Sequence, residues 1–253
     1  MRFPILAIVV AASAALPAGA RALAFAPGEE TVLAISYLGL PTGEGRISVG
    51  DPIGDLWPVT FQARTAGVAG FLDVREHLVC AWDAPTQLPR GSDLRAFELG
   101  DAHADSLHFD RAANVATVSV ERRDRRREKT VAVPPGAQDL TGAFMWLRLQ
   151  PLEMGERHQI PVLTGSKLFE LTAEVVGRRA VRTPAGTFDT VEVRVHLELA
   201  GQFQSRRDIQ LWFSDDPRHV LVRVEADLAL GGIVAELERY HPGQALAAAD
   251  RRD

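Results

Sequence analysis

Apolar and polar residues alternate with a period of two along much of this chain, a pattern typical of β-strands that bury one face. The alternation is clearest over 191–199, where Glu192 and Arg194 separate Val191, Val193 and Val195. It recurs at 33–37, 47–49, 59–63, 118–120, 131–133, 169–175, 209–213 and 220–230. We therefore predict a mainly β protein with about a dozen strands in an antiparallel series.

Turn-forming residues separate these stretches at short intervals, which favours a meander in which each strand pairs with the next. The predicted turns lie at 27–28, 41–43, 69–70, 134–136, 184–186 and 215–217. No repeat of fixed period and no low-complexity linker interrupts the series, so we expect a single domain over 25–240.

One segment follows helical spacing instead of strand spacing. Its apolar residues are Leu140, Ala143, Phe144 and Leu147. Asp139 precedes them as a suitable N-cap, and Pro151 with Gly155 follows them as a stop signal. These signals predict one short helix at about 140–150 that lies between two groups of strands.

The first 24 residues have the order of a secretory signal peptide, with Arg2, then an apolar run, then small residues. We expect cleavage after Ala24, with Ala18-Gly19-Ala20 as an earlier alternative. No later stretch is long and apolar enough to cross a membrane, so the mature chain is predicted to have no transmembrane segment. The tail at 241–253 is rich in alanine and charge and is predicted to be disordered.

Composition narrows the class of protein further. The chain has 253 residues, of which 46% are hydrophobic and 24% charged, which excludes a disordered or polytopic membrane protein. Removing residues 1–24 removes Arg2 and Arg21 but no acidic residue, and leaves 26 basic against 33 acidic side chains. This balance argues against a nucleic-acid partner. The basic residues are almost all arginine, which suggests GC-rich codon usage and a bacterial source.

Three residues at 101–105 have the types that bind metal ions. Asp101, His103 and Asp105 alternate, so a strand would place all three on one face, with His108 and Asp110 close behind. Imidazole and carboxylate groups suit zinc or manganese. The alternative is a solvated hairpin arm, and we favour it because no second cluster of ligand types accompanies the first. We therefore predict no metal and no other cofactor.

Glu76 occupies one of the alternate positions that are otherwise apolar in its predicted strand, between Val74 and Leu78. A carboxyl group buried there would have a raised pKa or would pair with an arginine, unless a β-bulge turned it outward. Cys80 shares this parity and is expected to be an inert core residue, with His77 on the opposite face. With one cysteine in the chain, no intrachain disulfide can form.

A basic run extends from Arg122 to Lys129, between strands predicted to end near Val120 and to begin at Val131. It could bind an anionic lipid or glycan phosphate. Glu121, Asp124 and Glu128 interrupt it, so we favour a solvated hairpin tip. No phosphate-binding loop, nucleophile elbow, metalloprotease helix or dinucleotide fingerprint occurs, and we predict that the protein is not an enzyme.

Several of these segments, in this order, resemble a family of bacterial exported proteins, domain of unknown function 3108. The most specific are Thr183–Phe188, which leads into a strand, and Trp212–Asp216; a glycine turn at 43–45 also matches. The residues that carry the resemblance are Gly28, Glu29, Tyr37, Asp139, Arg148, Gly155, Gly186, Phe188, Trp212, Asp215 and Asp216. The resemblance implies a curved antiparallel β-spiral, an open barrel-like roll similar to envelope integrity protein B. It implies structural roles for these residues and no catalytic ones.

Three functions are compatible with these observations. The first is a non-enzymatic binding or scaffold protein that helps maintain the cell envelope, in the periplasm of a Gram-negative bacterium, with an unknown envelope protein as partner. The second is a carrier whose curved sheet wraps around a lipid or another apolar ligand. The third is a metal-dependent hydrolase that uses the segment from Asp101 to His108.

Overall fold

The computed structural model describes residues 23–98, 100–123, 125–199, 207–228 and 231–244. They form β1 (Glu29–Tyr37), β2 (Leu40–Val49), β3 (Leu56–Thr65), η1 (Gly67–Leu72), β4 (Arg75–Asp83), β5 (Leu88–Glu98), β6 (Asp101–Asp110), β7 (Val115–Arg122), β8 (Arg125–Ala132), α1 (Leu140–Leu147), β9 (Arg157–Thr164), β10 (Lys167–Thr183), β11 (Gly186–Leu199), β12 (Arg207–Ser214), β13 (Leu221–Leu228) and β14 (Gly231–Pro242). The predicted mainly β class is confirmed.

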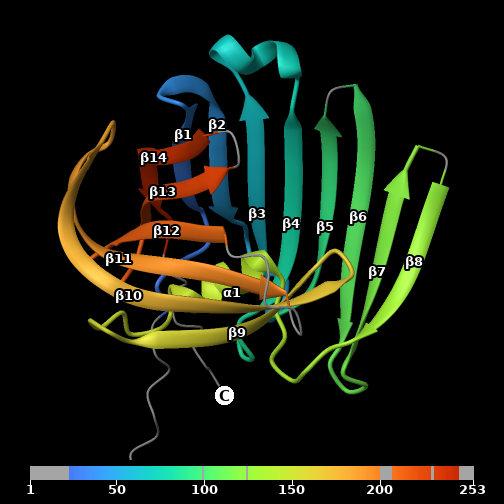
Figure 1. The fold of residues 1–253 in the computed structure, drawn as a ribbon. Helices are drawn as coiled ribbons and strands as arrows, with labels where there is room; N and C mark the ends of the chain where they lie inside the picture. The colour runs from blue at the N-terminus through green and yellow to red at the C-terminus, as the bar shows by residue number, and fades with distance from the viewer. Residues whose placement is uncertain (1–22, 99, 124, 200–206, 229–230, 245–253) are drawn as a thin grey trace, which may run out of the picture.

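All 14 strands belong to one antiparallel sheet, in the order β8 to β1 and then β14 to β9. Strands that are consecutive in the chain are neighbours in the sheet, except β8 and β9, and β1 additionally pairs with β14. The sheet curls around its own interior without closing, because β8 and β9 remain as its two edges (Figure 1). The curved, open, barrel-like roll is thus the observed architecture.

Helix α1 follows β8 and precedes β9, so it connects the two edges of the sheet and lies inside the roll (Figure 1). Asp139 is its N-cap, as predicted, and the side chain accepts a hydrogen bond from Gly142 N. The helix ends at Leu147, before the predicted end at 150. The two strand groups that it separates along the chain belong to the same sheet.

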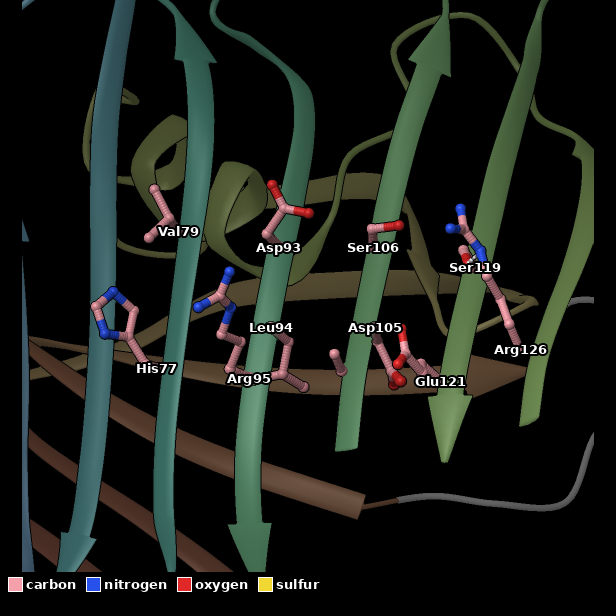
Figure 2. A pocket seen from close by; sticks show the side chains of 11 residues that line it. His77, Val79, Asp93, Leu94, Arg95, Asp105, Ser106, Ser119, Glu121 and Arg126 are labelled. Atoms are coloured by element: carbon pink, nitrogen blue, oxygen red, sulfur yellow. Dashed lines mark hydrogen bonds between the residues drawn. The ribbon is translucent and has the colours of Figure 1, made fainter. Parts of the chain in front are cut away.

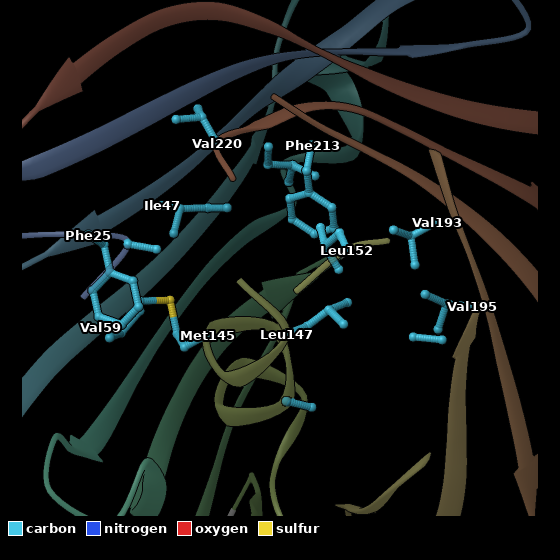
Figure 3. Packing of buried hydrophobic residues seen from close by; sticks show 14 of the residues in the cluster. Phe25, Ile47, Val59, Met145, Leu147, Leu152, Val193, Val195, Phe213 and Val220 are labelled. Carbon is cyan, nitrogen blue, oxygen red and sulfur yellow. The ribbon is translucent and has the colours of Figure 1, made fainter. Parts of the chain in front are cut away.

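The main core fills the space between α1 and the inner face of the sheet. Met145 and Leu147 of the helix pack there with residues from both halves of the sheet, among them Val59 and Phe213 (Figure 3). Strand residues reach this core at every second position because their side chains alternate between the two faces. The main core is therefore made by the same alternation that predicts the strands.

Trp212 is fully buried, in a separate small cluster with Val181 and Val222. Its neighbours Leu211 and Phe213 belong to the main core, so Trp212 faces the other side of the sheet. A register shift between Val175 and Gly177 interrupts the long β10–β11 hairpin before Val181. Such a shift changes which side chains face inward, and this allows the far part of the hairpin to cover Trp212.

The predicted turn at 41–43 and the predicted glycine turn at 43–45 are both wrong, because these residues lie within β2. The chain reverses instead at Leu38-Gly39, where both residues have positive φ angles of 50° and 77°. Gly43 has a different role: a Cβ atom there would lie 2.4 Å from the carbonyl oxygen of Arg64. Gly43 thus permits close approach of two strands. The reversal predicted at 69–70 does lie between β3 and β4, where the chain forms the 3-10 helix η1.

The two ends of the chain agree only partly with prediction. The predicted disorder from 241 onward is wrong at its start, because β14 continues to Pro242 and Gln244 N donates a hydrogen bond to Pro27 O. Residues 245–253 lie outside the described residues, as do residues 1–22, which make up most of the predicted signal peptide.

Candidate functional site

An apolar cleft of about 540 Å³ lies between the two halves of the curled sheet. One wall comes from β3 to β7, the opposite wall comes from β12 and β13, and α1 with the β9–β10 turn forms the floor. The apolar side chains that the cleft exposes include Leu78, Leu94, Leu107, Phe144, Leu211 and Val224. Each of these six side chains is only partly buried. Deeper in the roll, the helix covers the apolar side chains of the sheet, and they belong to the main core.

The cleft exists because α1 fills only part of the roll. Met145 and Leu147 are fully buried against the sheet, but Leu140, at the start of the same helix, is 49% exposed and lines the cleft. A large apolar side chain left exposed at an interior position is the feature expected of a binding surface.

Asp139 lies at the floor of the cleft and is itself buried. Its Oδ1 atom accepts the hydrogen bond from Gly142 N at 2.6 Å and is 3.8 Å from Cys80 Sγ. Burial raises the pKa of this carboxyl group, although the hydrogen bond from Gly142 and the positive charge of Arg111 oppose the shift. Its Oδ2 atom has no hydrogen-bond partner among the described residues.

Glu76 lies on the inner face of β4, as its parity predicts, and lines the cleft. Full burial is not observed, because part of the side chain is exposed, and no bulge displaces it: the register shift of β4 with β5 is at Ala81/Trp82. Partial burial raises the pKa of Glu76, and Glu98 adds to this through a hydrogen bond and its negative charge. The neighbour is thus a second carboxyl group, where we expected an arginine.

The residues predicted as weak metal ligands do share one strand, β6. Asp101 forms an ion pair with Arg123 at 2.9 Å, and Asp105 forms one with Arg122. Arginine side chains therefore occupy both carboxylates. Among the described residues, no group of three or more histidine, cysteine, aspartate or glutamate side chains is placed to hold a metal ion.

The basic run is not a hairpin tip, and that prediction is wrong. Strand β8 begins at Arg125, so most of the run belongs to an edge strand and only the turn after Arg122 is a tip. Arg125, Arg127 and Lys129 precede Val131 on one face of the strand, and Arg126 and Glu128 lie on the other. Because both faces are charged, the pattern of apolar and polar positions does not mark this part of the strand.

Cys80 is fully buried in the main core, as predicted, and burial raises the pKa of its thiol. A neutral, inaccessible thiol is a poor nucleophile.

His77 lies on the opposite face of β4, in a shallow polar groove of about 620 Å³ that crosses the outside of the sheet (Figure 2). The groove carries Asp93 and Glu121 beside Arg95, so its charge is mixed, and no single ligand charge matches it.

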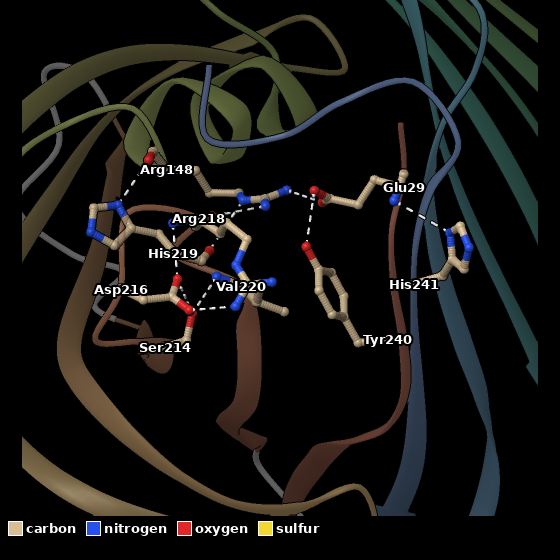
Figure 4. Close-up of polar contacts among 10 residues, drawn as sticks. Glu29, Arg148, Ser214, Asp216, Arg218, His219, Val220, Tyr240 and His241 are labelled. Atoms are coloured by element: carbon tan, nitrogen blue, oxygen red, sulfur yellow. Dashed lines mark hydrogen bonds and ion pairs between the residues drawn. The ribbon is translucent and has the colours of Figure 1, made fainter. Parts of the chain in front are cut away.

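Three of the residues that carry the family resemblance meet in one buried network (Figure 4). Arg148 Nη1 donates to Glu29 Oε1 at 2.7 Å, and the two side chains are only 2% and 3% exposed. The Tyr240 hydroxyl donates to the other oxygen of Glu29. Burial, together with the charge of Glu29, raises the pKa of Tyr240 to about 12. Asp216 forms an ion pair with Arg218, and the carbonyl oxygen of Arg218 accepts a hydrogen bond from Arg148 Nη2.

The other resemblance residues are spread over the fold. Gly28, Gly155 and Gly186 have positive φ angles at turns, where glycine is favoured. Tyr37 ends β1, Phe188 packs on the Trp212 cluster, and Asp215 pairs with Arg178 at 3.2 Å. None of these residues lines the cleft except Asp139. Among the described residues, neither helix is long and apolar enough to cross a membrane.

Comparisons with known proteins give a family and a fold. The family model for DUF3108, described as a protein of unknown function, matches residues 33–238. No curated protein matches the chain. A β-barrel-like protein of the DUF1849 family from Brucella abortus has a similar structure, with a TM-score of 0.61 and 8% identity, over 85% of this chain and 98% of that one.

Two further structures align less well. A candidate lipoprotein from Parabacteroides distasonis has a TM-score of 0.36 and 13% identity, and a candidate exported protein with a YmcC-like fold from Bacteroides fragilis has 0.35 and 15%. Both alignments cover 87% of this chain and 98% of the other. Only the first similarity supports the curled sheet as a shared fold.

Proposed function

This chain belongs to the DUF3108 family of proteins of unknown function, and we propose that it is an exported, non-enzymatic binding protein that holds an apolar ligand in its interior cleft. The signal-peptide pattern at 1–24 supports export to the periplasm or cell envelope. The cleft supports ligand binding more directly than it supports a scaffold for another protein, because its apolar side chains face inward.

The observation that carries the proposal is the cleft itself. Ligand sites usually have volumes of about 300–1,000 Å³ and mostly apolar walls with a few polar groups. This cleft, at about 540 Å³, has walls of leucine, isoleucine, valine and phenylalanine, with Glu76, Asp105 and Asp139 among them. The carboxylates at 101 and 105 pair with arginines, which weakens the case for a metal-dependent hydrolase.

The size of the apolar contribution indicates how tightly a ligand should bind. Burying an alkyl chain of about twelve carbons gains ~10 kcal/mol, at ~0.8 kcal/mol for each methylene group. Association costs at least ~4 kcal/mol in lost translation and rotation. The remaining ~6 kcal/mol corresponds to a dissociation constant of tens of micromolar.

A dye titration tests this function. N-phenylnaphthylamine, an uncharged dye that fluoresces in apolar surroundings, should bind the wild-type protein and be displaced by dodecanol. Val224→Phe places a larger side chain in the cleft and should weaken dye binding about tenfold or more, since overpacking a confined apolar site is costly.

Val79→Phe is the matched control, because Val79 is a similarly half-buried strand valine in the groove on the outer face. It should leave dye affinity unchanged. Absence of dye binding to the wild type, or equal loss of binding in both variants with intact folding, would exclude the cleft as the site.

A further inference from the structure

The inner faces of β7 and β8 carry a row of positive charge that begins where the apolar cleft ends. In register, Val118 pairs with Lys129, Val120 with Arg127, and Arg122 with Arg125. Val118 lines the cleft, whereas Val120 lines an adjoining depression of about 680 Å³ together with Arg125 and Arg127.

The cleft and the depression meet at Asp105. This residue lines the cleft, pairs in register with Val120 and forms the ion pair with Arg122. Cross-strand neighbours lie about 5 Å apart and same-face neighbours along a strand about 7 Å apart. A ligand whose chain lies against Val118 can therefore place its end against Arg127 without leaving this face of the sheet.

Among the described residues, acidic side chains neutralise only part of the positive charge on this face. Arg122 is paired with Asp105, and Arg123 with Asp101. In the described part of the chain, Arg125, Arg127 and Lys129 form no ion pair. On the outer face of the same strand, by contrast, Arg126 binds Ser119 and pairs with Glu128.

The positive side chains of this row repel one another. Arg125 lies directly opposite Arg122, and like charges at such positions destabilise a sheet. Charged residues often protect an edge strand from pairing with other chains, and mixed charges on both faces would serve that purpose. Here the charged side chains on the inner face of the two strands are all positive, and they lie beside an apolar cleft. Protection of the edge strand does not require this arrangement.

We propose that the inner face of β7 and β8 is the head-group subsite of the cleft, and that the ligand is an anionic amphiphile held by Arg125 and Arg127. This inference rests on the proposed function, because the apolar chain must occupy the cleft. The acidic pair Glu76 and Glu98 lies on β4 and β5, away from the edge strand β8, so the negative head is directed to the β8 side.

Competition for the uncharged dye tests the subsite with ligands that share one chain. Dodecyl phosphate, dodecanol and dodecyltrimethylammonium are compared below their micelle concentrations, and inorganic phosphate alone is a fourth arm. Dodecyl phosphate should bind about tenfold more tightly than dodecanol, from two partly exposed ion pairs. High salt should remove most of this preference, since it screens exposed charges.

The double variant Arg125→Gln/Arg127→Gln should lose the preference for dodecyl phosphate and retain its affinity for dodecanol and the dye. Arg126→Gln is the matched control on the outer face of the same strand, and it should retain the preference. If inorganic phosphate alone displaced the dye, the anion would bind in the dye's own site, and the proposal of an amphiphilic ligand would be wrong.

Two failures can be told apart. If the dye and dodecanol bind but dodecyl phosphate binds no better, or the ammonium compound binds best, the head-group subsite is wrong and the apolar cleft stands. If neither the dye nor any dodecyl compound binds, the proposed function fails and the subsite fails with it.

Discussion

Arg148 is a buried charge, and each of its three guanidinium nitrogens donates a hydrogen bond. Its Nη1 atom donates to Glu29, and Nε and Nη2 donate to the carbonyl oxygens of His219 and Arg218. These contacts fasten the end of α1 to the start of β1 and to the β12–β13 turn. A buried ion pair contributes little net stability compared with an apolar pair, but breaking one is costly because it leaves a charge unpaired.

We expect Arg148→Met to lower the free energy of unfolding by about 3–5 kcal/mol, because it leaves the Glu29 carboxylate buried without its partner. Urea denaturation would measure this loss. The double variant Glu29→Leu/Arg148→Met should be more stable than the sum of the single losses predicts, by at least ~1 kcal/mol. Additive losses would contradict a direct coupling between the two charges.

At the scale of elements, α1 begins at Asp139, whose carboxyl group caps the helix although it is buried. The sequence pattern correctly predicted this capping role. The position of Asp139 at the cleft floor could not be predicted, because that depends on how far the helix enters the roll. Capping requires an oxygen acceptor but not a charge.

Asp139→Ala should therefore lower the free energy of unfolding by about 1–2 kcal/mol through loss of the cap. Asp139→Asn keeps an acceptor and should lose much less. The raised pKa of Asp139 means that the native state holds the proton more tightly than the unfolded state, so this group makes stability fall as pH rises between the two pKa values.

Urea denaturation across the acidic range would follow that dependence. Asp139→Asn should reduce the fall in stability with rising pH relative to wild type. A steeper fall in the variant, or equal losses for asparagine and alanine, would be inconsistent with a cap formed by a carboxyl group of raised pKa.

The strands differ in how well the sequence predicts them. Segments such as β11 and β12, which alternate apolar with polar residues, are predicted because one face must be buried. Strand β8 is predicted to begin only at Val131, because none of its residues from Arg125 to Thr130 is apolar. The place of Gly43 inside β2 is missed because turn propensity does not report the close approach of Arg64.

At the scale of the whole molecule, the sheet is held in its curled form by contacts between distant parts of the chain. Strand β1 pairs with β14, and α1 links the two edges through the centre of the roll. The pairing of β1 with β14 does not follow from local patterns, since it joins residues far apart in sequence. The cleft is a consequence of this arrangement, and for that reason the sequence alone predicts a possible carrier but not its site.

Native mass spectrometry of the protein, purified from the exporting cell without detergent, tests the central claim most directly. The account predicts one bound amphiphile per chain, seen as added mass that disappears on denaturation, or acquired in one-to-one ratio when the empty protein is mixed with dodecyl phosphate. Only the bare polypeptide mass, both before and after mixing with excess ligand, would contradict a roll built around a binding cleft.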